Sequence, residues 1–260
     1  MAGDSITLIW ALAPVMPGCA GAARIRMKEA VAGMDERVRQ AGLLYERAVF
    51  TGDAGPLAAA GRELDAAEAD LALARGRLMH ARFLLCRDQD PATAEEDPGE
   101  LPLFECAARL YRALGDVRGE ARALFWVGCL HQVVRHDNAA AVPVLEQSLK
   151  LASQAGDKAV MSEALRHLGI AAHGTGQLEL ARQRLEESTR LRREIGLLPG
   201  AAANMVGLAY IAAAQQRSDD ALALLDEASA IAEASQAHRI LRQVSEARAE
   251  LSGQHPRRPA

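Results

Sequence analysis

The stretch HLGIAAHGTGQLELA, residues 167–181, decides the fold. Two apolar segments flank a short polar turn at Gly174, Thr175 and Gly176, and apolar residues return at helical spacing after it. This pattern is typical of two antiparallel helices joined by a tight turn. Because one such hairpin cannot bury its apolar face alone, other parts of the chain must pack against it.

The same pattern recurs along the chain at a nearly constant period. The apolar residues that close successive helices are separated by 41, 40 and 40 residues: Leu110, Leu151, Leu191 and Ile231. Small residues recur in step with them, at Gly128, Gly169 and Ala209 and again at Ala141, Ala181 and Ala221. Small residues let helix backbones approach closely. The period predicts an all-α stack of antiparallel helical hairpins.

The clearest unit, with Leu168, Gly169, Ala181, Leu185 and Ser188, resembles the tetratricopeptide repeat in its longer variant of about 40 residues. The resemblance implies a right-handed superhelical α-solenoid. It covers clear repeats over residues 101–236, with a terminal capping helix at 237–252, inside one helical-repeat domain spanning 35–252.

Upstream of residue 101 the period is less clear. Helices are expected at 36–50 and over 57–85, the second as two helices or as one helix bent near Gly61 or Gly76. Residues 87–99 are expected to form a solvated loop insertion. Residues 1–34 are expected to be a disordered leader or an over-extended start, with Met27 or Met34 as the true beginning, and secretion is the alternative. A disordered tail is expected at 253–260.

Composition narrows the classes of function. The chain has 30 basic and 34 acidic residues, a formal net charge of -4, so it offers no broad attraction for nucleic acid or an anionic membrane. Its four cysteines are widely spaced and form no metal-binding or disulfide pattern, which favours a reducing, cytoplasmic setting. No nucleotide-binding or hydrolase motif is present, and no cofactor or metal is expected.

In the tetratricopeptide family the first helix of each hairpin lines a concave groove, so the resemblance implies candidate binding positions. They are Arg122, Phe125, Cys129 and Gln132 in the first clear unit, Glu163, Arg166, Ile170 and His173 in the second, and Ala203, Val206, Tyr210 and Ala213 in the third. The arginines present planar donors suited to a carboxylate or phosphate, unless Glu163 or Glu120 already pairs with them. His167 is expected to pack between hairpins.

Two classes of function remain open. The first is a scaffold or adaptor, with a regulatory role as one option, that binds a partner protein or an acidic peptide in the groove. The second is a small-molecule binder or enzyme that uses a polar cluster of Arg166, His173, Gln132 and Tyr210. Cys129 is either a nucleophile with His173 as its base or a buried structural residue. Self-association through the almost uncharged segment 201–214 is a further alternative.

Overall fold

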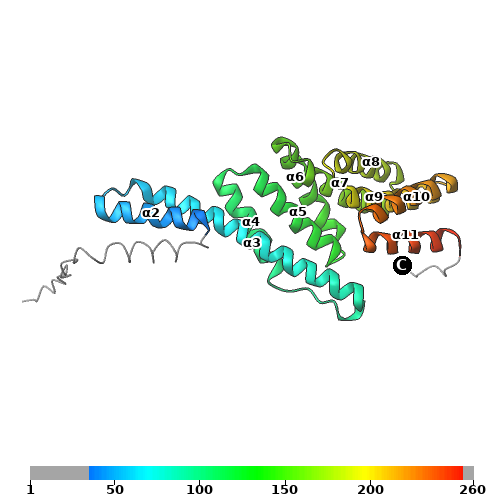
Figure 1. Ribbon diagram of the computed structural model, residues 1–260, viewed down its shortest axis with the longest axis horizontal. Helices are drawn as coiled ribbons and strands as arrows, with labels where there is room; N and C mark the ends of the chain where they lie inside the picture. Colours follow the sequence, from blue (N-terminus) through cyan, green and yellow to red (C-terminus); the bar gives the residue numbers. More distant parts are fainter. Residues whose placement is uncertain (1–34, 254–260) are drawn as a thin grey trace, which may run out of the picture. The chain divides into compact units, whose positions relative to one another are not determined.

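The computed structural model describes residues 35–253, which form ten α-helices, one short 3-10 helix and no β-strand (Figure 1). The predicted leader at 1–34 and residues 254–260 of the predicted tail lie outside the described residues. Within this range, no helix combines the length and the apolar character that crossing a bilayer requires.

The chain divides into two compact units, Met1–Ala67 and Glu68–Ala260. The first contains α2 (Glu36–Thr51) and the beginning of α3 (Gly55–Gln89). Asp35 caps α2 by accepting a hydrogen bond from the backbone of Arg37, and Gly52 ends it with a φ of 72°.

The second unit contains the rest of α3 and the helical stack. Its helices are α4 (Glu100–Leu114), α5 (Val117–Val133), α6 (Asn138–Ala155), α7 (Lys158–Gly174), α8 (Leu178–Glu194), α9 (Leu198–Ala214), α10 (Ser218–Ala234) and α11 (His238–Leu251). From α4 to α11 each helix packs against the next, and α5, α7, α9 and α11 also pack against one another in that order. This arrangement confirms the predicted all-α stack of hairpins, with α5, α7 and α9 as its inner helices.

The caps explain why the helices begin and end where they do. Asp116, Asp137 and Asp157 precede α5, α6 and α7, and each accepts a hydrogen bond from a backbone N–H in the first turn. Gly115 and Gly156 end α4 and α6 in the left-handed region, at φ of 74° and 63°.

The recurring small residues lie where helices approach most closely. A Cβ added to Gly128 would lie 2.6 Å from Cγ of Leu145, and one added to Gly169 would lie 3.0 Å from Cγ of Leu185. A serine follows each of these leucines by three residues, at Ser148 and Ser188, and its hydroxyl hydrogen-bonds to the preceding helix. Ser148 Oγ donates to the carbonyl of Ala121 at 2.7 Å and fastens α6 to α5.

Upstream, α3 is one continuous helix, and it extends to Gln89, four residues beyond the expected 85. Gly76 lies inside this helix, and its missing side chain leaves room for the Phe104 ring, since an added Cβ would lie 2.5 Å from a ring carbon. The predicted loop at 87–99 is therefore shorter, and it contains a 3-10 turn, η1 (Pro91–Thr93), capped by Asp90.

The segment 201–214, considered for self-association, belongs to α9 and is buried inside the stack. Met205 and Ile211 are each 1% exposed, and Leu208 is 8% exposed. Its apolar composition is thus explained by packing against α8, α10 and α11.

Candidate functional site

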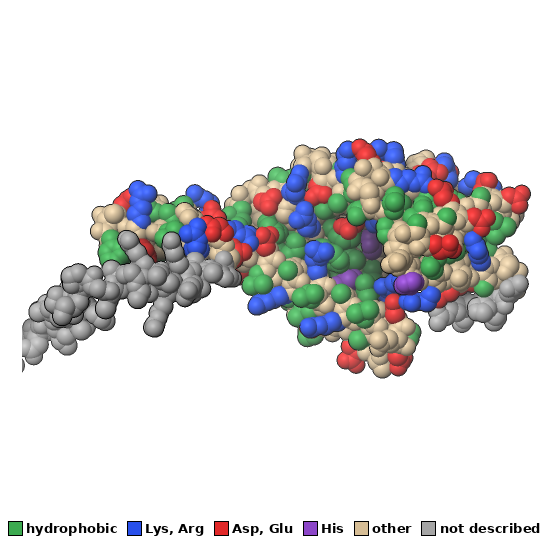
Figure 2. Space-filling model, viewed as in Figure 1, with side chains coloured by type: hydrophobic (Ala, Val, Ile, Leu, Met, Phe, Trp, Pro, Cys, Tyr) green, Lys and Arg blue, Asp and Glu red, His purple; other side chains and the backbone are tan. Residues whose placement is uncertain are grey.

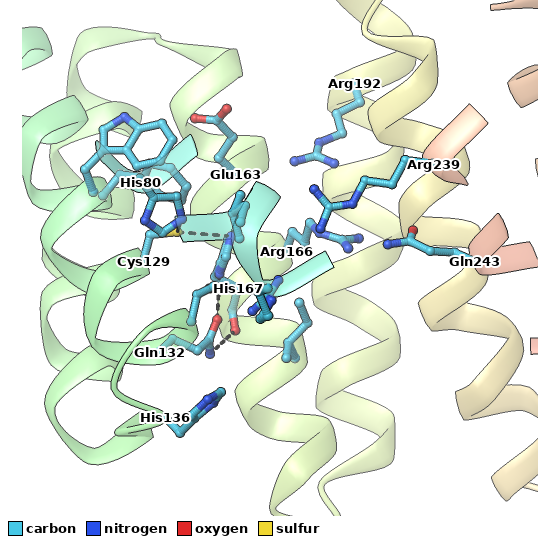
Figure 3. A pocket seen from close by; sticks show the side chains of 16 residues that line it. His80, Cys129, Gln132, His136, Glu163, Arg166, His167, Arg192, Arg239 and Gln243 are labelled. Carbon is cyan, nitrogen blue, oxygen red and sulfur yellow. Dashed lines mark hydrogen bonds between the residues drawn. The ribbon is translucent and has the colours of Figure 1, made fainter. Parts of the chain in front are cut away.

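A pocket of about 480 Å³ opens on the second unit, with walls from α3, α5, α7, α8 and α11 (Figure 3). Figure 2 shows the hollow, in which histidine side chains lie among apolar and basic ones. Six of the residues predicted from the repeat resemblance line it: Phe125, Cys129, Gln132, Glu163, Arg166 and Ile170.

The other predicted positions lie elsewhere. Ala203, Val206 and Tyr210 line a second hollow of about 270 Å³, together with Arg166 and Ile170. Ala213 packs into the core formed by α9 and α10.

Arg122 and His173 line neither hollow. Arg122 lies one turn into α5 and donates to Asp157 at 3.2 Å. His173 is exposed at the end of α7. Neither Glu163 nor Glu120 pairs with the predicted arginines, since Glu120 accepts from Arg112 instead.

Several lining residues were not predicted, and most of them come from helices other than the predicted inner ones. They are His80, Leu84 and Arg87 on α3, Trp126 and Val133 on α5, His136 after α5, His167 on α7, Arg192 on α8, and Arg239 and Gln243 on α11. His167 therefore lines the pocket, although it was expected to pack between hairpins.

Four arginines line the pocket, and Arg166 and Arg192 are the two that neutral groups hold in place. Arg166 Nη1 donates to Asn204 Oδ1 at 2.8 Å, and Arg192 Nη1 donates to the carbonyl of Gly200 at 2.8 Å and to Asn204 Oδ1 at 3.3 Å. All of these acceptors are neutral. Among the described residues, neither guanidinium forms an ion pair with a carboxylate.

Burial acts on both charges. Burial, with the neighbouring charge of Arg192, lowers the pKa of Arg166 to about 10. Burial also lowers the pKa of Arg192, whereas the nearby Glu163 opposes that shift. Both side chains remain charged at neutral pH, and one acidic residue is found among the described residues that line the pocket.

Glu163 is that acid, and its environment weakens it. Burial raises the pKa of its carboxyl group above the usual range, while Arg192 and Arg77 act in the opposite direction. Glu163 therefore offsets part of the positive charge without binding either arginine directly.

A chain of polar contacts crosses the floor of the pocket. Nδ1 of His80 lies 2.8 Å from Oε1 of Glu100, and both side chains are buried. Cys129 Sγ lies 3.7 Å from Nε2 of His80 and 4.0 Å from Nε2 of His167. Because Gln132 Oε1 lies 2.6 Å from Nδ1 of His167, that nitrogen carries the proton and donates it.

This chain of contacts corrects the proposed pairing of Cys129 with His173, because His80 and His167 are the imidazoles beside the thiol. Burial raises the pKa of the Cys129 thiol, with Glu163 and Glu100 adding to the shift. Burial, with Arg166, lowers the pKa of His167 to about 3. The thiol and that imidazole are thus uncharged at neutral pH, which favours a structural role for Cys129 over a nucleophilic one.

Within residues 35–253, no three His, Cys, Asp or Glu side chains are arranged to hold a metal ion. At the edge of the pocket, Arg239 Nη2 on α11 donates to Asp88 Oδ1 on α3 at 3.0 Å. This ion pair joins two helices that are 151 residues apart at these positions and borders the pocket on that side.

In comparisons with known proteins, no family model matches the chain and no curated protein is significantly similar to it. The tetratricopeptide resemblance therefore remains a prediction, while the helical stack itself is established by the structure.

Proposed function

We propose that the protein is a tetratricopeptide-like recognition module that binds an acidic segment of a partner protein in this pocket. The observation that carries the proposal is the pair Arg166 and Arg192, a half-buried and a buried arginine whose guanidinium groups are held only by neutral acceptors. A carboxylate entering the pocket would form charge-assisted, bidentate hydrogen bonds with such groups.

The shape of the site favours an extended ligand. The main pocket and the second hollow share Arg166, Ile170 and Gln243, so together they form one elongated trough. Ile170 is 41% exposed and lies between the two hollows, where it would contact an apolar side chain next to the bound acid. A peptide in which acidic and apolar side chains alternate would place its acids on the arginines and an apolar side chain on Ile170.

A small anionic molecule is the second candidate. It is favoured by the volume of the main pocket, about 480 Å³, which is in the usual range for a small-molecule site. The polar cluster expected for this alternative is not assembled as predicted. Arg166 and Gln132 line the pocket, but Arg192 and His167 take the places expected for His173 and Tyr210.

We further propose a cytoplasmic location and a regulatory role exerted through the bound partner. Free thiols support the first proposal, since Cys86 is exposed and Cys106 and Cys129 form no disulfide.

Isothermal titration calorimetry on the full chain tests the function. The probes are an end-blocked peptide of alternating Glu and Leu, the same peptide with Gln in place of Glu, and citrate. We expect the Glu peptide to bind, the Gln peptide to bind at least about tenfold more weakly, and salt to weaken binding.

Two variants locate the binding. Arg166→Gln is expected to reduce affinity at least about tenfold, because it removes a buried charge-assisted contact worth about 1.5–3 kcal/mol. Arg109→Gln, an exposed arginine on α4, is the matched control and leaves affinity unchanged. Citrate binding with no peptide binding would favour the second candidate, and equal affinities for the Glu and Gln peptides would contradict both.

A further inference from the structure

Five leucines recur at every seventh position along α3, and all of them are exposed. Leu57, Leu64, Leu71, Leu78 and Leu85 have exposed fractions between 46% and 62%. An alanine follows each of the first four leucines by three residues, at Ala60, Ala67, Ala74 and Ala81. A seven-residue repeat with apolar residues at its first and fourth positions is the pattern of a coiled coil. We call these nine residues the α3 seam.

The chain's own core does not use the exposed leucines of this seam. In the second unit, α3 buries Ala69, Ala72, Leu73 and Phe83. These buried residues occupy other positions of the seven-residue repeat and lie on a different face of the helix. Leu71, Leu78 and Leu85 are therefore left on the solvent side. Exposed apolar side chains aligned along a helix mark an interaction surface.

Charges beside the seam change sign along the helix. Glu63 and Glu68 flank its first half, and Arg75 and Arg82 flank its second half. In a parallel pair of α3 helices, Glu63 would face Glu68 of the other copy. In an antiparallel pair the acidic half of each helix meets the basic half of the other, which removes that repulsion.

One antiparallel register satisfies both the packing and the charge. When Leu71 lies opposite Ala74 of a second copy, Leu78 lies opposite Ala67 and Leu64 opposite Ala81. Leu64, Leu71 and Leu78 of each copy then meet an alanine of the other copy, which allows the two helices to pack closely. In the same register Glu68 of each copy flanks Arg75 of the other.

We propose that two copies of the chain associate through the α3 seam as an antiparallel helix pair. The pairing of Glu68 with Arg75 carries the choice of orientation, because both are exposed. Asp70 and Arg77 also flank the seam, but Tyr111 and Trp126 already contact them, so the choice of orientation does not depend on these two residues.

Sedimentation velocity of the full chain over a concentration series tests the association. The expected result is a monomer–dimer equilibrium. Leu71→Ser combined with Leu78→Ser is expected to raise the dimer Kd at least about 100-fold by removing apolar contact area. The control, Leu197→Ser with Leu222→Ser, changes two leucines of similar exposure outside α3 and leaves the Kd unchanged. A monomer at every concentration, or a dimer unaffected by the α3 changes, overturns the proposal.

Charge reversal tests the orientation. In the antiparallel pair, Glu68→Arg and Arg75→Glu each place like charges together, so each variant alone dimerises more weakly. An equimolar mixture of the two variants restores every opposite-charge contact and is expected to form a heterodimer. Stronger dimerisation of Glu68→Arg alone would show a parallel pair, because the introduced guanidinium would then meet Glu63 of the other copy, and would overturn the antiparallel assignment. Circular dichroism of each variant verifies that its helices are intact.

Discussion

Arg166 on α7 and Asn204 on α9 are joined by a hydrogen bond of 2.8 Å from the guanidinium to the amide oxygen. Asn204 is fully buried and also accepts from Arg192, while its own amide nitrogen donates to Ser188 at 2.8 Å. A neutral amide thus stands where an ion pair would require a carboxylate. The arginines are held in position, and their charge remains available to a ligand.

Asn204→Asp tests this relationship. The added carboxylate would pair with both arginines, so anion affinity measured by calorimetry is expected to fall at least about tenfold. The free energy of unfolding should change by less than about 2 kcal/mol, because the new ion pair is offset by the loss of the donor to Ser188. Gln183→Glu, an exposed site on α8, controls for the change in net charge. Undiminished affinity in Asn204→Asp would contradict the assignment of these arginines to the ligand.

Gly128 is predicted to be required for packing. Gly128→Ala places a Cβ 2.6 Å from Leu145, which cannot move freely because it is fully buried. We expect a loss of about 1–3 kcal/mol in the free energy of unfolding, measured by urea denaturation. Gly174→Ala is the control, since a Cβ there meets nothing within 4 Å. Equal stability of the two variants would show that the close approach of α5 and α6 is not needed.

His167 is predicted to make stability depend on pH. Its pKa is lowered from 6.5 to about 3 in the folded chain, so the unfolded chain takes up a proton first as the pH falls. The contribution of the neutral, buried His167 to the free energy of unfolding is fully present above pH 6.5 and declines towards pH 3. At pH 5 the loss in the free energy of unfolding is up to about 2 kcal/mol.

The measurement compares urea denaturation of wild type and His167→Gln at pH 7 and pH 5. Glu163 has a raised pKa and acts with the opposite sign, but its effect is common to both proteins and cancels in the difference. We expect His167→Gln to lose less stability than wild type between the two pH values. Parallel pH profiles would contradict the burial of a neutral His167.

Cysteine reactivity is predicted to follow exposure. Cys86 is exposed, whereas Cys129 is 4% exposed and burial raises the pKa of its thiol. Cys129 should therefore react with iodoacetamide at least about 100-fold more slowly than Cys86. Peptide mass spectrometry distinguishes the two sites, and the unfolded chain should label both at similar rates. Rapid labelling of Cys129 in the folded protein would indicate an activated nucleophile instead.

The helical stack could be predicted from the sequence because its determinants are local and repeated. Gly128 and Gly169 mark the same close contact in successive units, and Leu145 and Leu185 fill the space beside them. Helix α3 was harder to interpret because both of its faces are apolar. Its buried Leu73 and Phe83 lie opposite the exposed leucines of the seam, so hydrophobic periodicity does not show which face is inside.

The site was only partly predictable because some of its residues come from helices other than the inner ones. Arg166 and Gln132 follow the inner-helix rule of the repeat, whereas Arg192 comes from an outer helix and reaches the pocket only beside Gly200. A Cβ on that glycine would lie 2.9 Å from the guanidinium, so Gly200 is the one sequence signal for it. Contacts such as Asp88 with Arg239 depend on how distant helices meet, and no local pattern reports them.

The central claim is that the arginine-lined pocket binds an anionic segment, and Trp126 in its wall reports on this directly. The chain has two tryptophans, so Trp10→Phe leaves Trp126 as the sole source of indole fluorescence. Titration with the end-blocked Glu and Leu peptide should change that fluorescence saturably, and adding Arg166→Gln should shift the midpoint at least about tenfold. No fluorescence change, or the same midpoint in both proteins, would contradict the account.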